Sequence, residues 1–364
     1  MTSDAELEIE ALRRLLHEHD LVERHDPEPA PITAAGSARL ARSITAAHPA
    51  PLARARAPRR ALTTVGAIAA CVGLAIAVVV GVVRAPVSEA ATTPRMLDYS
   101  LTDPRMPLVD APAATDALTA IAQAARSSND PTGIGDVQFV ANYGWYLSIE
   151  HDATGTTSQI FPTFTRSWLA ADGSATVTQS RGSALDTDGR TSPDTPAGIG
   201  GTDVLPVGTL DAGLAARLDA TTDEPALQTA LLELSAGLPC DRDTRWHAQC
   251  LVEAVLQLYN LYVVPPTLTA RIWDILGHET AIHDLGTTTD RMGRPAVAVA
   301  LPSDPDDTIR TTVSVLILSP DTGQLTGTET ITLSDTVSPV TEPAVTSFTT
   351  WIDRQWVTIV AKAP

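Results

Sequence analysis

The sequence predicts an α+β protein with a short cytoplasmic helical segment, one transmembrane helix and an extracytoplasmic antiparallel β-sheet domain covered by helices. Three observations support this class. Residues 61–83 contain neither a charge nor a proline. Further along the chain, segments rich in β-branched and aromatic residues are joined by tight turns, which is typical of an antiparallel meander. Helical patterns between residues 211 and 276 can cover the sheet that these strands form.

The apolar stretch at residues 61–83 is long enough to cross a membrane. As a helix its 23 residues span roughly 34 Å, against about 30 Å of hydrocarbon. Four arginines precede it closely and only Arg84 follows it, so the positive-inside rule places residues 1–60 in the cytoplasm and residues 84–364 outside. A cleaved signal peptide is the alternative, but the apolar core of a signal peptide has only about 7–15 residues, which is shorter than this stretch. We therefore expect a retained anchor in the lipid bilayer.

Small residues recur along one side of this span at steps of three and four. Such a stripe allows two helices to approach closely, which would form a homodimer through the membrane. The alternative is that a span rich in alanine forms the stripe by chance. The residues concerned are Gly66, Ala70, Gly73, Ala77 and Gly81.

The charge of the chain is unevenly distributed. Residues 1–60 contain nine arginines and nine acidic residues, and the span contains no charge. The net charge of −18 therefore falls entirely on the outer segment. Because an acidic surface repels phosphate polymers, we expect no nucleic acid among the partners of the outer segment.

The cytoplasmic segment, residues 1–60, begins with an amphipathic helical pattern at residues 3–16. Such a helix can dock on a cytosolic partner, and a solvated, frayed segment is the alternative. His17, His19 and His25 follow it, but no cysteine occurs in this segment. We expect these histidines to lie on the surface rather than to bind a metal.

The outer segment divides into a stalk and a domain. Residues 84–112 are punctuated by proline, so we expect an extended stalk, and residues 113–364 form the α+β domain. Residues 181–208 have the composition of a polar loop. The expected elements are helix 113–127, strands 137–150, 157–170 and 175–178, helices 211–218, 222–237, 247–262 and 265–276, and strands 280–285, 294–301, 311–318, 327–333 and 356–361.

Two cysteines of the three lie on the predicted outer side. Cys240 and Cys250 meet oxidising conditions there, which permit a disulfide. A continuous helix between them would hold them about 15 Å apart, which is too far for a bond. The pairing therefore requires the chain to bend between them. Cys71 lies within the span, where we expect it to act as a small apolar residue.

No motif in the chain predicts catalysis, a metal site or a cofactor. His278 and His283 resemble a zinc-protease helix, but that motif needs its histidines four residues apart and these are five apart. The glycines at 133–135 and 198–201 do not join a strand to a helix, so neither group predicts a phosphate loop. We therefore expect a protein that is not an enzyme.

Aromatic residues gather in one part of the outer domain. Nearly half of the chain's Phe, Tyr and Trp residues lie within 30 positions, from residue 139 to residue 168. Their spacing allows them to line a cavity for an apolar ligand between the sheet and the helices. A filled hydrophobic core is the alternative. The residues that we expect to line such a cavity are Phe139, Tyr143, Trp145, Leu147, Phe164 and Trp168.

An ordered set of short motifs resembles an uncharacterised actinobacterial family of single-pass membrane proteins, often encoded beside extracytoplasmic-function sigma factors. The motifs are the basic segment and the span, GWYL (144–147), WLAADGS (168–174), GLP (237–239), TDRMGRP (289–295) and SPDTGQL (319–325). The resemblance implies no catalytic residues. It implies an anti-sigma-like envelope sensor whose residues 1–60 bind a cytosolic sigma factor. The alternative is an anchored module that binds a lipid or another apolar ligand, with an open, helix-plugged sheet similar to that of periplasmic lipoprotein carriers.

Overall fold

The computed structural model describes residues 92–128, 133–152, 155–182, 199–235, 240, 246–303, 310–336 and 341–358. The expected cytoplasmic helix, the expected span at 61–83 and its small-residue stripe lie outside these residues. Among the helices of the described part, none is both long and apolar enough to cross a membrane.

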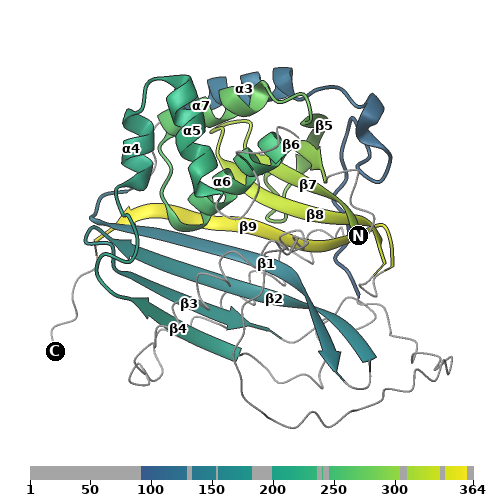
Figure 1. The fold of residues 1–364 in the computed structure, drawn as a ribbon, viewed down its shortest axis with the longest axis horizontal. Helices are drawn as coiled ribbons and strands as arrows, with labels where there is room; N and C mark the ends of the chain where they lie inside the picture. Colours follow the sequence, from purple (N-terminus) through teal and green to yellow (C-terminus); the bar gives the residue numbers. More distant parts are fainter. Residues whose placement is uncertain are drawn as a thin grey trace, which may run out of the picture.

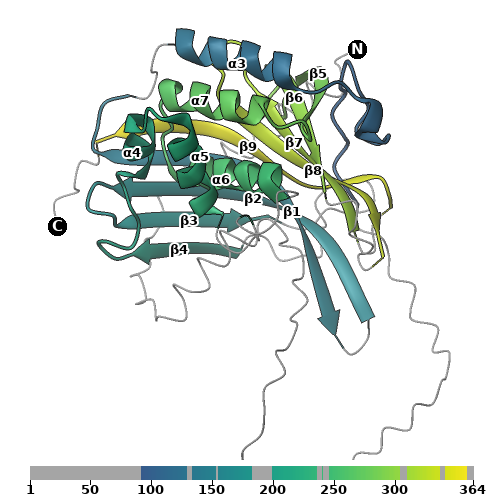
Figure 2. The same ribbon diagram turned by 45° about the horizontal axis from the view of Figure 1, so that its top comes forward.

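The centre of the domain is a nine-stranded antiparallel sheet with the strand order β4-β3-β2-β1-β9-β8-β7-β6-β5 (Figure 1). Two meanders, β1–β4 and β5–β9, are joined where β1 pairs with β9. The ends of β1 and β2 project away from the helices (Figure 2). The strands are β1 (Val137–Asp152), β2 (Gly155–Ala170), β3 (Ala175–Arg181), β4 (Ile199–Leu205), β5 (His283–Thr289), β6 (Pro295–Pro302), β7 (Arg310–Leu318), β8 (Leu325–Asp335) and β9 (Ala344–Val357).

The α-helices lie together on one side of the sheet (Figure 1). Local sequence explains their ends: the Asp223 side chain caps α5 by accepting from the backbone N–H of Ala226 at 3.0 Å, and Pro225 occupies the first turn, as expected. The described helices are η2 (Leu108–Asp110), α3 (Thr115–Ser127), α4 (Leu214–Ala220), α5 (Glu224–Leu234), α6 (His247–Leu261) and α7 (Pro266–Gly277).

Alternation along the strands gives the sheet two apolar faces. On β6 and β7, Val299 and Leu316 pack with the helices, whereas Ala298 and Val315 belong to a second cluster. Successive strand residues point to opposite sides, so the two clusters lie on opposite faces of the sheet. We call them the helix-covered face and the reverse face.

Residues 92–112, which we call the N-terminal strap, belong to the stretch predicted as an extended stalk (84–112), and they pack against the domain. The backbone N–H of Ser100 donates to the carbonyl of Thr287, and that of Leu101 to the carbonyl of Leu285, both at 3.0 Å. These bonds cover the outer edge of β5. Met96, Leu97, Tyr99 and Leu108 pack on the reverse face. Their apolar side chains explain why the strap stays on the sheet.

β5 (His283–Thr289) begins and ends later than the strand expected at 280–285. Two other strands differ more from the predictions. β4 lies within residues 181–208, which we expected to be loop, and its Gly200 and Gly201 give no β propensity. β9 begins at Ala344, well before the strand expected at 356–361. A bulge opposite Ala141 and Asn142 interrupts its alternation, which hides the strand pattern. Both strands exist because their neighbours offer backbone partners.

The structure contains a disulfide between Cys240 and Cys250, with a Cα–Cα distance of 6.0 Å. This distance excludes a continuous helix between the two cysteines. α6 accordingly begins at His247, and Cys250 lies buried in its first turns.

Candidate functional site

The register of β1 and β2 brings all six expected lining residues onto one face of the sheet. Odd-numbered positions of β1 share a face, and Phe164 and Trp168 of β2 pair directly with Tyr143 and Phe139. Tyr143, Trp145 and Phe164 pack with the second apolar cluster, so this is the reverse face. We call the set the aromatic strip: Phe139, Tyr143, Trp145, Leu147, Phe164 and Trp168.

The expectation that these residues line a cavity between the sheet and the helices is wrong. The aromatic strip lies on the face of the sheet that the helices do not cover. On the helix-covered face, the large side chains of Tyr259 and Trp273 are fully buried in a continuous apolar core. The two faces could not be distinguished from alternation, because a strand pattern does not say which face the helices cover.

The rings of the aromatic strip touch one another but are not fully buried. Phe139 and Trp168 lie with ring centroids 5.3 Å apart, and Trp145 lies 5.5 Å from Phe348 of β9. The Trp145 indole N–H donates to the hydroxyl of Tyr143. Of the six residues only Tyr143 is buried, and the others keep partial exposure. The strip therefore offers apolar area that a ligand can remove from water.

Two arginines border these rings. Arg166 lies on β2 between Phe164 and Trp168 on the same face, with its guanidinium carbon 4.6 Å from the centroid of the Phe164 ring. Arg291 lies 4.6 Å from the centroid of the Phe348 ring. Arg291 is paired with Glu329, whereas the described residues offer Arg166 no ion pair. Arg166 is thus a cation that lies beside apolar rings, in a domain that is acidic overall.

The N-terminal strap contacts the sheet beside the aromatic strip. The Tyr99 hydroxyl donates to Oε2 of Glu329 at 2.9 Å, and the Arg291 guanidinium donates to Oε1 of the same carboxylate. Burial raises the pKa of the Tyr99 phenol well above its ordinary value, and the Glu329 charge adds to this increase. The carboxylate of Glu329 is fully buried and satisfied by these two partners.

The histidines of the apparent zinc-protease motif are separated. Nδ1 of His278 lies 3.5 Å from a carboxylate oxygen of Glu224, whereas Nδ1 of His283 lies 3.2 Å from the carbonyl oxygen of Ala111. In the described part of the chain, no three His, Cys, Asp or Glu residues are arranged to hold a metal ion.

A partly open hollow of about 240 Å³ lies away from the aromatic strip. It is formed by α3, β5, β6 and the turn after β7, with Ile121, Val297 and Asp284 among its walls. Oδ1 of Asp284 already accepts a 2.7 Å hydrogen bond from the backbone N–H of Gly286. The hollow is small, and it shares no residue with the strip.

Sequence reasoning missed three residues around the strip: Arg166, Arg291 and Phe348. The alternation of residues 164, 166 and 168 could have placed Arg166 beside the expected rings. No local signal could have found Arg291 or Phe348. The pairing of β9 with β1 brings Phe348 opposite Trp145, and Arg291 reaches Phe348 from the turn between β5 and β6.

Comparison with known proteins gives no family for this chain. No protein-family profile matches it, and no curated protein does. Among solved structures, a DUF1329 family protein from Desulfovibrio piger is 12% identical with a TM-score of 0.20, covering 72% of this chain and 96% of its own. A putative outer membrane lipoprotein-sorting protein domain from Vibrio parahaemolyticus is 8% identical with a TM-score of 0.18, covering 68% and 95%. Similarities this low support no statement about function.

Proposed function

We propose that the outer domain is a non-catalytic binding module that holds an amphiphile with an apolar tail and one anionic group on the aromatic strip. The observation that supports this most directly is the position of Arg166, between Phe164 and Trp168 and without an ion pair among the described residues. The partly exposed rings favour a tail, and the guanidinium favours a carboxylate or a phosphate.

Charge and apolar area together give the site its selectivity. The acidic domain repels anions in general. An anion that also brings an apolar tail gains about 0.8 kcal/mol for each methylene that leaves water against the rings. Affinity should therefore rise with chain length, and a tail alone or a small anion alone should bind weakly at the strip.

The cellular setting fits an envelope molecule. The Cys240–Cys250 disulfide is typical of an oxidising compartment. The anchor expected at residues 61–83 would hold the module beside the bilayer. The link to a cytosolic sigma factor stays an expectation from the sequence, because residues 1–60 lie outside the described part.

Photo-crosslinking tests the proposal. The full chain in phosphatidylcholine nanodiscs is labelled with a diazirine-bearing fatty acid or with the matched fatty alcohol, and the labelled residues are mapped by mass spectrometry. We expect the acid to label β1 and β2. Arg166→Met should weaken acid labelling about tenfold, since one charge-assisted hydrogen bond contributes about 1.5–3 kcal/mol.

Within each variant, labelling by the acid is compared with labelling by the alcohol, which has no anionic group. Arg105→Met is the control for loss of an arginine outside the aromatic strip. Arg105 is an exposed arginine of the strap, paired with Asp103. Alcohol labelling should not change in Arg166→Met, and neither ligand should be affected by Arg105→Met. The proposal would be contradicted if no label were found on β1 and β2, or if the acid and the alcohol labelled every variant to the same extent.

A further inference from the structure

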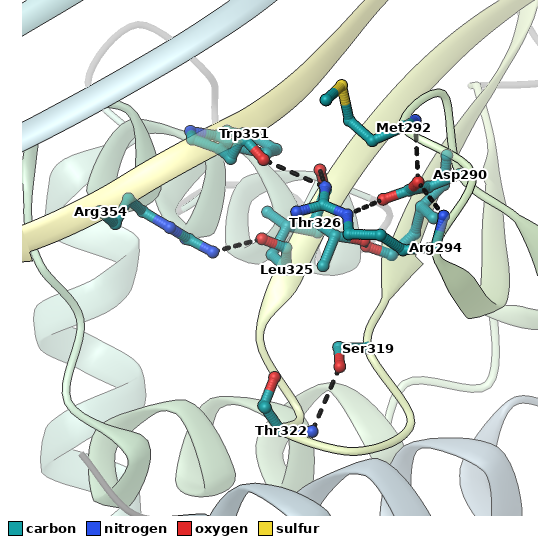
Figure 3. A network of polar contacts seen from close by, with 10 residues as sticks. Asp290, Met292, Arg294, Ser319, Thr322, Leu325, Thr326, Trp351 and Arg354 are labelled. Carbon is teal, nitrogen blue, oxygen red and sulfur yellow. Dashed lines mark hydrogen bonds and ion pairs between the residues drawn. The ribbon is translucent and has the colours of Figure 1, made fainter. Parts of the chain in front are cut away.

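A second arginine, Arg354 of β9, lies on the helix-covered face without a carboxylate partner among the described residues. Its guanidinium carbon is 4.4 Å from the centroid of the Tyr259 ring and 5.6 Å from that of the Trp351 ring. Nη2 donates to the carbonyl of Leu325 (Figure 3). Asp353, its neighbour in the chain, lies on the opposite side of the strand and accepts from the amide of Gln355 at 2.6 Å.

Two donors at this point have no partner among the described residues. Nη1 of Arg354 and Nε1 of Trp351 are both buried, and neither makes a hydrogen bond within the part of the chain that the structure describes. The rings of Tyr259 and Trp351 attract the cation but do not take the place of an acceptor in the guanidinium plane. An unsatisfied buried donor costs about 1–3 kcal/mol, more for a charged one, so native proteins rarely keep one without a ligand or a water.

The local charge is unbalanced. The guanidinium of Arg294 donates to the carbonyls of Thr326 at 3.3 Å and Trp351 at 3.1 Å, close to Arg354 (Figure 3). Asp290 accepts from Nε of Arg294 at 2.6 Å. Among the described residues, Arg294 thus has a carboxylate partner and Arg354 has none. Burial, together with the positive charge of Arg294, lowers the pKa of Arg354 to about 10.

We propose that Arg354 and Trp351 form a binding site for one small anionic group, a carboxylate or a phosphate monoester, on the helix-covered face. The anion accepts from Nη1 of Arg354 and from the Trp351 indole N–H, and it balances the second guanidinium. Arg354 is partly exposed as a residue, although its Nη1 is buried. The group is either a free anion or the headgroup of a lipid.

This site is independent of the aromatic strip. Arg354 aligns with Val140 on β1, whereas Arg166 aligns with Ala141, the next residue, which points to the other face. A small anion without a tail should bind at Arg354 and only weakly at the strip. The two proposals can therefore fail separately: Arg166→Met tests the aromatic strip, and Arg354→Met tests the second site.

The test uses the full chain in a nonionic detergent, with its six tryptophans replaced by 5-fluorotryptophan. Trp351→Phe assigns the fluorine resonance of Trp351. Sodium phosphate is titrated in one arm and lysophosphatidic acid in the other. We expect a saturable shift of the Trp351 resonance, with the dissociation constant at least tenfold weaker in Arg354→Met.

The control variants are Arg310→Met and Arg166→Met. Arg310 is a part-buried arginine that pairs with Asp335, and Arg166 belongs to the aromatic strip. Neither should change the phosphate titration. A shift with phosphate identifies a free anion, and a shift with the lipid alone identifies a headgroup; both support the site.

The proposal is overturned if neither ligand shifts the Trp351 resonance, or if Arg354→Met binds as tightly as the wild type. If Arg354→Met does not fold, the proposal is judged from which tryptophan resonances shift in the wild-type titration. A shift confined to Trp351 then supports the site, and a shift shared equally by Trp145, Trp168 and Trp273 rejects it.

Discussion

The hydroxyl of Tyr99 donates a 2.9 Å hydrogen bond to the buried carboxylate of Glu329, a residue 230 positions further along the chain. Glu329 also accepts from Arg291, whose guanidinium lies over the ring of Phe348. The bond fastens the N-terminal strap to the middle of the sheet, beside the aromatic strip. The N-terminal strap is therefore part of the folded domain.

Tyr99→Phe removes this bond and leaves one oxygen of a buried carboxylate without its donor. We expect the free energy of unfolding to fall by about 2 kcal/mol, because hydrogen bonds to charged groups contribute about 1.5–3 kcal/mol. Urea denaturation measures the change. Tyr262→Phe is the matched control, since no described residue bonds to the Tyr262 hydroxyl, and it should change stability by less than about 0.5 kcal/mol. Equal losses in the two variants would mean that the strap is not fastened by this bond.

Alkaline pH should destabilise the domain. Burial raises the pKa of all five tyrosines, and that of Tyr143 to about 12. Above pH 10 the folded state keeps phenol protons that the unfolded state releases. The contribution of the buried tyrosines to the free energy of unfolding is therefore complete below pH 10 and is lost as pH rises from about 10 towards 12. Arg354, whose pKa is lowered to about 10, acts in the opposite direction but is a single group.

The measurement for this prediction is chemical denaturation at pH 9 and pH 11. Tyr143→Phe should lose about 1 kcal/mol less than the wild type between these values, because one pKa unit corresponds to about 1.4 kcal/mol. Phenolate absorbance should appear only as the protein unfolds. Tyrosines that ionise near pH 10 in the folded protein would refute the assignment of burial as the cause.

Removal of the Cys240–Cys250 disulfide should lower the free energy of unfolding by about 3 kcal/mol. The bond closes a loop with a sequence separation of 10 residues, and the chain-entropy model gives this magnitude for such a loop. The double variant Cys240→Ser/Cys250→Ser is compared with the wild type by urea denaturation. A reductant should destabilise the wild type and leave the double variant unchanged; no effect on the wild type would contradict the prediction.

Gly323→Ala should destabilise the turn between β7 and β8. Gly323 has φ +66°, and a Cβ atom there would lie 2.5 Å from Cβ of Ala125 and 2.6 Å from the carbonyl oxygen of Ile121 in α3. Strain and overpacking together should cost about 3 kcal/mol. Gly201→Ala is the control, since its Cβ would meet no atom within 4 Å, and thermal unfolding of both variants makes the comparison. A similar loss at both positions would show that α3 does not rest on this turn.

Local patterns predicted most elements because each pattern agrees with its surroundings. β1 and β2 were predicted from their aromatic and β-branched residues, and α5 from Asp223 and Pro225 at its start. The Cys240–Cys250 pair was predicted from the expected compartment and is present in the structure. β4 was missed because two glycines carry no strand signal, and only pairing with β3 orders them.

The candidate sites show the same division. The six residues of the aromatic strip could be chosen from composition and spacing, but their face could not. Arg354 gave no signal, since it precedes the strand expected at 356–361 and a lone arginine is most often a solvated residue. Its unusual surroundings come from Tyr259 of α6 and Leu325 of β8, which are distant in sequence.

The sequence by itself determined the α+β class, the succession of strands and helices, the pairing of the outer cysteines and the grouping of the aromatic residues. These follow from periodicity and composition, which act over a few neighbouring residues. The tertiary structure alone decided that β1 pairs with β9, that the helices cover the face away from the aromatic strip, and that the N-terminal strap closes the β5 edge. Those outcomes depend on which apolar faces meet, and strand alternation is the same whichever face is covered.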